Sequence, residues 1–381
     1  MTVRTDVGTI DDLHASATKL TGLTDFGTDD YLEGLGVLLD SYRDEAGLTE
    51  FGSKMSRFFL RGALIARALS EAAWAAQPPE TPITAPIFVT GLPRTGTTAL
   101  HRLLAADPAH QGLEMWLTEF PQPRPPVDSW ASNPAFQQID AGLRAQQVRD
   151  PDFMGLHYMS AGDVEECWQL LRQSSMSHSY ECLAHVPSYS RWLAAQDWTP
   201  AYARHRRNLQ LIGHNDPRRW VLKNPSHLFC LDALLAVYPD AIVIQTHRDP
   251  ATVLASVCSL NDHATRGWST VFTPDVIGRT QLDLWARGAA EFAAARARHP
   301  EATFLDVDFA DLRADPVGVV TSIYAALGTE FTDAARAGVL ALDAESHSGA
   351  RKPTHNYALA DYGLTPDLIG ERFAEEVSHA K

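Results

Sequence analysis

The sequence is poor in cysteine, and none of its cysteines forms a recognisable pair. Its 381 residues include four cysteines, Cys167, Cys182, Cys230 and Cys258, with no C-x-x-C pair and no Cys/His cluster at zinc-ligand spacing. This pattern excludes a disulfide scaffold and a structural zinc site. We therefore expect buried, reduced thiols and no metal.

Long apolar runs and an excess of positive charge are also missing. No stretch approaches the roughly 18 apolar residues that span a membrane, and residues 1–16 lack the apolar core of a signal peptide. With 32 basic and 47 acidic residues, the net charge is −15, which disfavours binding of nucleic acid or anionic membranes by the bulk surface. We expect a soluble, cytoplasmic protein without a transmembrane segment, in which any anion site is a local concentration of donors.

The loop at residues 91–98 lacks the lysine that phosphate-binding loops usually contain. Residues 91–98 read GLPRTGTT, whereas a phosphate-binding loop of nucleoside triphosphatases reads G-x-x-x-x-G-K-[ST]. Thr97 stands where that lysine belongs, and Arg94 lies three residues earlier. Without the lysine, and with only Asp306 and Asp308 as candidates for a second magnesium ligand, magnesium–ATP chemistry is disfavoured.

The loop nevertheless has the features of an anion site. Gly91 and Gly96 let the backbone curl tightly, and the amides of residues 94–98 are expected at the start of a helix, where negative charge is favoured. The hydroxyls of Thr97 and Thr98 add donors. The sequence thus predicts binding of a phosphate-like group.

The rest of the chain predicts an α/β fold. Apolar strand patterns at 86–90, 219–225, 241–250 and 302–312 alternate with helical patterns, which indicates a P-loop-like parallel β-sheet with helices on both faces. We expect a helical N-terminal extension at 1–80 packed on the core, an α/β domain at 86–365 with a mostly helical insertion at 115–215, and a C-terminal tail at 366–381.

Polar residues follow three of these strands: the loop at 91–98, Lys223 with His227, and Arg248. In such sheets the ligand lies beyond the carboxyl ends of the strands. The three segments are therefore expected to meet at one rim of the sheet.

These segments resemble a known family. Residues 91–100 (GLPRTGTTAL) resemble the 5′-phosphosulfate loop of sulfotransferases that use 3′-phosphoadenosine-5′-phosphosulfate (PAPS). Residues 246–256 (THRDPATVLAS) are similar to their 3′-phosphate segment, and residues 220–228 and 350–365 extend the likeness. The arginine in the loop is typical of a bacterial branch that also resembles the tyrosylprotein sulfotransferases.

The resemblance implies PAPS as sulfuryl donor, 3′-phosphoadenosine-5′-phosphate (PAP) as product, and in-line transfer to a hydroxyl or amine. The residues that it assigns to the donor are Arg94, Thr95, Gly96, Thr97, Thr98, Arg248, Ser256, Arg351 and Lys352. Where related enzymes have an RKG triplet, this chain has Pro353, which lacks a backbone N–H. Arg94 and Lys223 are the cations expected to meet charge on the leaving oxygen.

Two residues are candidates for the base that takes the acceptor's proton. Glu114 follows the loop at a distance comparable to the catalytic glutamate of the tyrosylprotein sulfotransferases, and we favour it. His227 is second, since cytosolic sulfotransferases use a histidine. Glu181 and the pair Glu165/Glu166 are weaker candidates, because no motif ties them to the site.

The sequence leaves the acceptor open: the hydroxyl group of a small molecule or a lipid is expected, and a phenol, a lipid alcohol, a sugar and a peptide tyrosine are all compatible with the sequence. A homo-oligomer is also compatible with it. Two other functions compete with sulfuryl transfer. One is a metal-dependent P-loop kinase or nucleoside triphosphatase, and the other is a non-catalytic protein that binds PAP.

Overall fold

A sheet of five parallel strands lies at the centre of the structure, a computed structural model that describes residues 6–78, 80–151, 159–347 and 358–379. The strand order is β2-β3-β1-β4-β5. The strands are β1 (Ile87–Gly91), β2 (His110–Gln111), β3 (Arg219–Lys223), β4 (Ile242–His247) and β5 (Thr303–Asp308). The predicted parallel sheet is confirmed, and β2 adds a short edge strand.

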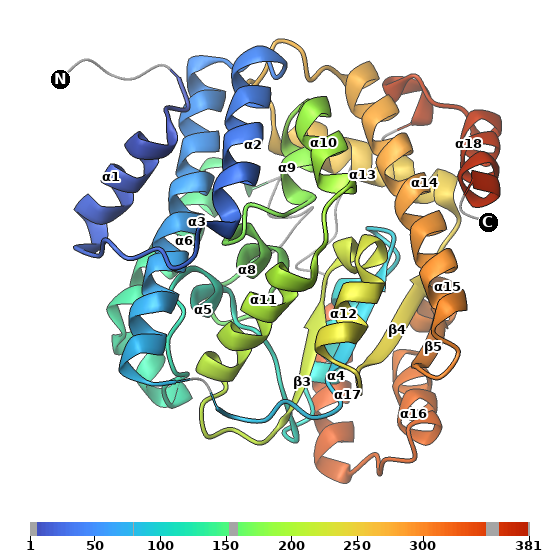
Figure 1. The fold of residues 1–381 in the computed structure, drawn as a ribbon. Coiled ribbons are helices and arrows are strands. Elements are labelled where there is room, and N and C mark those ends of the chain that lie inside the picture. Colours follow the sequence, from blue (N-terminus) through green and yellow to red (C-terminus); the bar gives the residue numbers. More distant parts are fainter. Residues whose placement is uncertain (1–5, 79, 152–158, 348–357, 380–381) are drawn as a thin grey trace.

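Helices cover both faces of the sheet, as predicted, because alternate strand residues point to opposite sides. Ile87 and Val89 of β1 pack in one apolar cluster with α4, α16 and α17. Phe88 belongs to a second, larger cluster with α11, α12 and α14. Figure 1 shows α4 and α12 on opposite sides of the strands. The bounds are α4 (Thr97–Ala105), α11 (Thr199–Ile212), α12 (Leu231–Val237), α14 (Pro274–Arg298), α16 (Pro316–Ala326) and α17 (Asp333–His347).

The N-terminal helices and the insertion form a helical layer beside the sheet (Figure 1). Helix α3 contacts α1, α5, α8 and α11, and α2 contacts α10. The N-terminal elements are α1 (Ile10–Thr21), η1 (Asp29–Tyr31), α2 (Leu32–Asp44) and α3 (Glu50–Ala76). The insertion holds α5 (Met115–Glu119), η2 (Val127–Ser132), α6 (Pro134–Arg149), α8 (Trp168–Arg172), α9 (Ser179–Leu183), α10 (Pro187–Ala194) and α11, so it is mostly helical, as expected.

The C-terminal part closes one side of the molecule. Helix α18 (Pro366–His379) packs along α14, so the segment that the sequence analysis treated as a tail is helical over these residues. The remaining elements are α13 (Pro250–Ala264), α15 (Phe309–Ala314) and η4 (Leu359–Tyr362). No helix in the described part of the chain is long and apolar enough to cross a membrane.

Two elements have bounds that differ from the sequence pattern. The apolar spacing of residues 227–239 predicts one continuous helix, but the turn η3 (Pro225–Phe229) comes first and α12 starts only after Cys230, whose φ of −133° is not helical. Likewise β5 stops at Asp308, and α15 begins at the next residue. Both breaks lie at the carboxyl side of strands, where the chain turns back over the sheet.

Candidate active site

The loop between β1 and α4 is shaped by two glycines. Gly91 has φ of 141°, and a Cβ there would lie 2.5 Å from the carbonyl oxygen of Thr246 on β4, so only glycine fits. Gly96 has φ of 90° and immediately precedes the first residue of α4, Thr97. The loop therefore ends directly at the amino end of α4, where backbone N–H groups without a partner inside the helix favour an anion.

The threonine side chains of the loop differ in their exposure to solvent. Thr95 is fully buried, and its hydroxyl bonds to the carbonyl oxygen of Leu92 at 2.6 Å and to the hydroxyl of Thr246 at 2.5 Å. Thr97 is buried, whereas Thr98 is exposed. Thr95 thus fixes the loop to β4 and offers a ligand only its backbone, while Thr98 offers its hydroxyl.

Arg94, Arg248 and Ser256 meet beside the loop. The Arg94 Nε donates to Ser256 Oγ at 3.1 Å, and Arg248 Nη1 donates to the carbonyl oxygen of Arg94 at 2.9 Å. The Arg248 guanidinium stacks 4.2 Å from the ring centre of Phe309, at the start of α15. The structure therefore joins the two predicted phosphate segments, which are more than 150 residues apart in sequence.

Arg94 adopts a conformation that is uncommon for a side-chain-bearing residue. Its φ of 66° lies in the left-handed region, which costs of order 1 kcal/mol or more for a non-glycine residue. This conformation accompanies the two contacts that link Arg94 to Arg248 and Ser256. Strained backbone of this kind is concentrated at ligand sites, and its presence here agrees with the sequence prediction.

Lys223 ends β3 and faces the loop from the neighbouring strand. It is buried, its Nζ donates to Thr98 Oγ1 at 3.1 Å, and it forms an ion pair with Glu166. The backbone fixes this pair, because the N–H of Cys167 donates to the carbonyl oxygen of Lys223 at 3.0 Å. The insertion thus brings Glu166 to the rim of the sheet. No sequence motif predicts this position for Glu166, which was a weaker candidate for the base.

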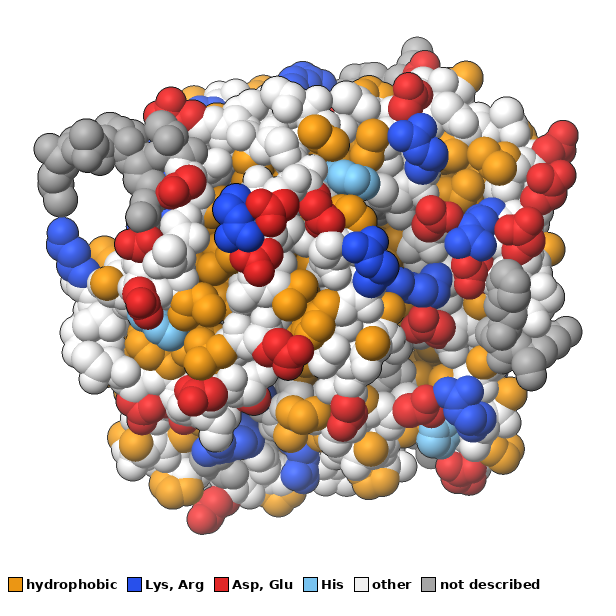
Figure 2. Space-filling view, turned by 45° about the horizontal axis from the view of Figure 1, so that its top comes forward, with side chains coloured by type: hydrophobic (Ala, Val, Ile, Leu, Met, Phe, Trp, Pro, Cys, Tyr) orange, Lys and Arg blue, Asp and Glu red, His pale blue; other side chains and the backbone are white. Residues whose placement is uncertain are grey.

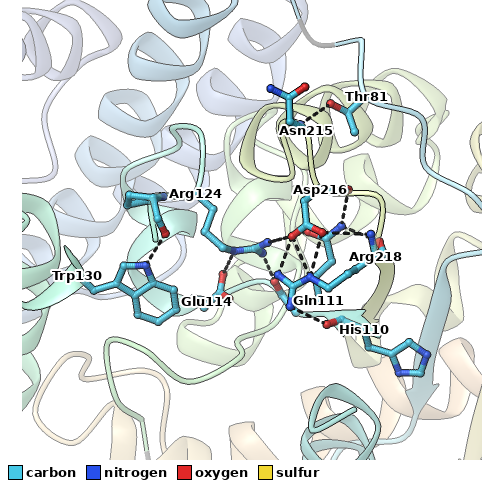
Figure 3. A network of polar contacts seen from close by, with 11 residues as sticks. Thr81, His110, Gln111, Glu114, Arg124, Trp130, Asn215, Asp216 and Arg218 are labelled. Atoms are coloured by element: carbon cyan, nitrogen blue, oxygen red, sulfur yellow. Dashed lines mark hydrogen bonds and ion pairs between the residues drawn. The ribbon is translucent and has the colours of Figure 1, made fainter. Parts of the chain in front are cut away.

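Glu114 lies in a different polar network, near the edge strand β2 (Figure 3). Its Oε2 accepts from Arg124 Nε at 3.0 Å, and the same guanidinium bonds to Gln111 Oε1 at 2.7 Å and to Asp216 Oδ2 at 3.3 Å. Burial raises the pKa of Glu114, and the charge of Arg124 partly opposes this effect. These contacts favour a structural role for Glu114, whose predicted role as base stays a prediction.

Arg124 should stabilise this network strongly. Its guanidinium makes four hydrogen bonds, the shortest at 2.5 Å to the carbonyl oxygen of Gly112. We expect Arg124→Met to lower the free energy of unfolding by about 3–5 kcal/mol, because it leaves Glu114 buried without its cation. Urea unfolding measures this change.

A surface ion pair provides the control for that variant. Arg144 bonds to Asp140 one helical turn away, but its side chain is 77% exposed. Arg144→Met should change the free energy of unfolding by less than about 1 kcal/mol. Equal effects of the two variants would mean that the Arg124 network does not stabilise the fold.

His227 and Glu181 have partners away from the loop. His227 is fully buried in η3, its Nδ1 lies 2.5 Å from the Tyr202 hydroxyl, and its ring packs edge-on against Phe88. Burial holds the pKa of His227 well below its usual range. Glu181 Oε2 pairs with His178 Nδ1 at 2.5 Å on α9. The neutral, core-packed imidazole favours a structural role for His227, and its role as base stays a prediction.

Two donor-binding residues proposed from the sequence, Arg351 and Lys352, lie outside the residues that the structure describes, as does Pro353. Within the described ranges, no group of three or more His, Cys, Asp or Glu side chains is arranged to hold a metal ion. The four cysteines are free and buried. The site is thus described by its loop, by Lys223 with Glu166, and by the Arg94–Arg248–Ser256 cluster.

A comparison with protein families identifies the family to which this site belongs. A model described as the sulfotransferase family matches residues 86–333, which include the loop, Lys223 and the segment from Arg248 to Ser256. The chain belongs to the sulfotransferase family. The resemblance seen in the motifs is confirmed, and with it sulfuryl transfer as the activity type of the family.

Solved structures agree over nearly the whole chain. The sulfotransferase STF1 from Mycobacterium tuberculosis is 60% identical, with a TM-score of 0.91, and the match covers 98% of this chain and all of that one. The sulfotransferase STF9 from Mycobacterium avium is 27% identical, with a TM-score of 0.86, over 97% of this chain and 96% of that one. The P-loop-like sulfotransferase fold predicted from the sequence is therefore confirmed.

A curated relative carries a specific acceptor in its name. Omega-hydroxy-beta-dihydromenaquinone-9 sulfotransferase Stf3 of Mycobacterium bovis and Mycobacterium tuberculosis is 26% identical over 253 residues. The match covers 64% of this chain and 62% of that protein, so the chain spans less than two thirds of the relative's length. This likeness is partial.

Proposed function

We propose that the chain transfers a sulfuryl group from PAPS to a hydroxyl group. The observation that carries this proposal is the contact chain from the loop through Arg94 to Arg248 and Ser256. A donor with a 5′-phosphosulfate and a 3′-phosphate needs two anion sites at a fixed separation. The loop amides with Thr97 and Thr98 fit the first site, and Arg248 with Ser256 fits the second.

The residues present suit this donor without a metal. Arg248 offers a planar guanidinium for a phosphate. Lys223 places a buried ammonium against Thr98, the neighbour of Thr97, which stands where a nucleoside triphosphatase has its lysine. Arg351 and Lys352 remain proposed as further donors to the 3′-phosphate. When bound, PAPS would supply the activated sulfuryl group, and the cations of Arg94 and Lys223 would offset the charge that forms on the leaving oxygen.

The acceptor that we propose is the hydroxyl group of a small molecule or a lipid. The relative Stf3 is named for a lipid-like acceptor with a terminal hydroxyl, a hydroxylated dihydromenaquinone. Among the described residues, the aromatic rings of Trp116, Trp130 and Phe136 in the insertion pack on one another in the core. The proposed acceptor therefore rests on the likeness to Stf3 and not on these rings.

PAP should raise the melting temperature of the protein in the presence of EDTA. A ligand at 100 times its Kd stabilises the folded state by about 2.7 kcal/mol. AMP, which lacks the 3′-phosphate, should stabilise much less because it leaves Arg248 and Ser256 without an anion. Thermal unfolding with PAP, AMP and magnesium–ATP makes the comparison.

The same experiment separates the competing functions. A larger shift with magnesium–ATP than with PAP would replace the proposal by a kinase or nucleoside triphosphatase. Stabilisation by PAP without any formation of PAP from PAPS, across a panel of phenols and long-chain alcohols, would favour a non-catalytic PAP-binding protein.

A further inference from the structure

The first half of helix α3 exposes aromatic side chains instead of burying them. Phe51 and Phe58 are 52% and 55% exposed. They are seven residues apart, close to two helical turns, so they leave the helix on the same side. Val271, which is 36% exposed, lies against Gly47 just before α3 begins. The surface formed by Phe51, Phe58 and Val271, which we call the α3 face, is therefore apolar.

A buried tryptophan supports the α3 face from below. The ring centre of Trp268 lies 6.4 Å from that of Phe51 and 6.0 Å from that of Phe59, and Phe58 packs edge-on against Phe59 at 5.6 Å. The loop that carries Trp268 is bonded to the start of α3, because the N–H of Thr49 donates to the carbonyl oxygen of Trp268 at 2.8 Å. The exposed rings thus project from a packed base.

Basic side chains flank the exposed rings. Lys54 lies between Phe51 and Phe58 in the sequence and is exposed, and Arg61 follows Phe58 by about one turn. Residues 50–62 contain three basic residues and one acidic residue, in a chain whose net charge is −15. This stretch therefore combines exposed apolar area with a charge opposite to that of the whole chain.

We propose that the α3 face docks on the surface of an anionic lipid bilayer. Phe51 and Phe58 enter the headgroup region, while Lys54 and Arg61 meet the lipid phosphates. Helices that bind in the membrane interface have this composition, with aromatic side chains on one side and lysine or arginine beside them. Docking itself goes beyond sulfuryl transfer, and only its use for reaching a lipid acceptor rests on the proposed function.

The size and shape of the α3 face favour a bilayer over a protein partner. A phenylalanine side chain has roughly 150–250 Å² of surface, so two half-exposed rings with Val271 offer roughly 300 Å². A second copy of the chain would need about 800 Å² on each partner. The cavity beside Phe58 has a volume of about 20 Å³, which is room for a single water and not for a partner's side chain. A bilayer needs no such area or groove, because attraction of the cations adds to insertion of the rings.

Contacts connect the α3 face to the site through α8. The cavity beside Phe58 is also lined by Phe59 and by Arg172 of α8, whose guanidinium lies 5.0 Å from the ring centre of Phe59. Helix α8 begins directly after Cys167, whose N–H donates to the carbonyl oxygen of Lys223 at 3.0 Å. A bilayer at the α3 face therefore lies on the side of the molecule from which α8 leads to Lys223.

Flotation of the protein with lipid vesicles tests the inference and needs neither PAPS nor an acceptor. We expect the protein to float with vesicles of phosphatidylcholine mixed with phosphatidylglycerol at low ionic strength. Binding should weaken with added salt and on phosphatidylcholine alone. The variant Phe51→Ser/Phe58→Ser should lower the partition coefficient by about 10-fold or more, and Lys54→Glu should lower it by about 10-fold.

Two exposed apolar residues elsewhere provide a matched control. Leu340 on α17 and Leu368 on α18 are 49% and 41% exposed, and both helices lie away from α3 (Figure 1). Leu340→Ser/Leu368→Ser should bind vesicles as the wild type does. Because every substituted side chain is exposed, all variants should keep the fold, and their melting temperatures check this.

Absence of wild-type binding to the anionic vesicles, or equal binding by Phe51→Ser/Phe58→Ser, would overturn the inference. Analytical ultracentrifugation adds a second outcome: a wild-type dimer that this variant converts to a monomer would assign the α3 face to a second copy of the chain and overturn bilayer docking. None of these results bears on the donor site, since the proposed function fails only if PAP does not bind or PAPS is not used.

Discussion

Replacing Lys223 with alanine should lower the rate of sulfuryl transfer by about 10²–10³-fold, the loss that follows removal of one preorganised donor to a developing negative charge. The ammonium lies between the phosphate loop and Glu166, and its charge matters most as the leaving oxygen becomes anionic. The affinity for PAP should fall much less than the rate. Rates of PAP release from PAPS and calorimetric Kd values for PAP make the comparison.

Controls separate lost chemistry from lost stability in that experiment. Lys223 and Glu166 are both buried, so removing the cation alone leaves a buried carboxylate without its partner. The double variant Lys223→Met/Glu166→Gln removes both charges and should unfold closer to wild type than Lys223→Ala. A Lys223→Ala protein that is folded and turns over at the wild-type rate would disprove the role of Lys223.

Arg248→Ala should weaken PAP binding by about 2 kcal/mol, or roughly 30-fold, as expected for lost charge-assisted hydrogen bonds to a phosphate. AMP binding should change little, because AMP has no 3′-phosphate. The Arg248 guanidinium also bonds to the carbonyl oxygen of Arg94 and stacks on Phe309. A comparison of both nucleotides is therefore needed to separate ligand binding from support of the loop.

Calorimetry of PAP and AMP with wild type, Arg248→Ala and Arg248→Lys gives that comparison. Lysine keeps the charge but not the planar pair of donors, so we expect an intermediate loss of PAP affinity. Similar losses for PAP and AMP would show that Arg248 supports the loop and does not recognise the 3′-phosphate.

Much of the fold, and the meeting of the loop with Lys223 and Arg248, could be predicted from local sequence patterns. The strands that end at Gly91, Lys223 and His247 are short apolar runs followed by polar residues, and parallel strands bring their carboxyl ends to one rim. That rule predicted the meeting of the loop with Lys223 and Arg248 before any contact was known. Two-residue β2 was not predicted, since so short a strand has no periodicity to detect.

The surroundings of the candidate bases could not be predicted in the same way. Glu166 reaches Lys223 through pairing of the insertion with the chain after β2, and no local pattern encodes that pairing. His227 lies four residues after the end of β3, close to the rim in sequence. The turn η3, however, directs its ring toward Tyr202 and Phe88 in the core. Acidic and basic side chains are mixed over the face shown in Figure 2.

A crystal structure with bound PAP tests the central claim most directly. We predict the 5′-phosphate about 3 Å from the backbone N–H groups of residues 94–98 and the Thr98 hydroxyl, with the 3′-phosphate at hydrogen-bond distance from Arg248 and Ser256. Lys223 Nζ should then contact the 5′-phosphate and lie farther from Glu166 than in the free protein. PAP bound elsewhere, or with its 3′-phosphate away from Arg248 and Ser256, would contradict the proposed site.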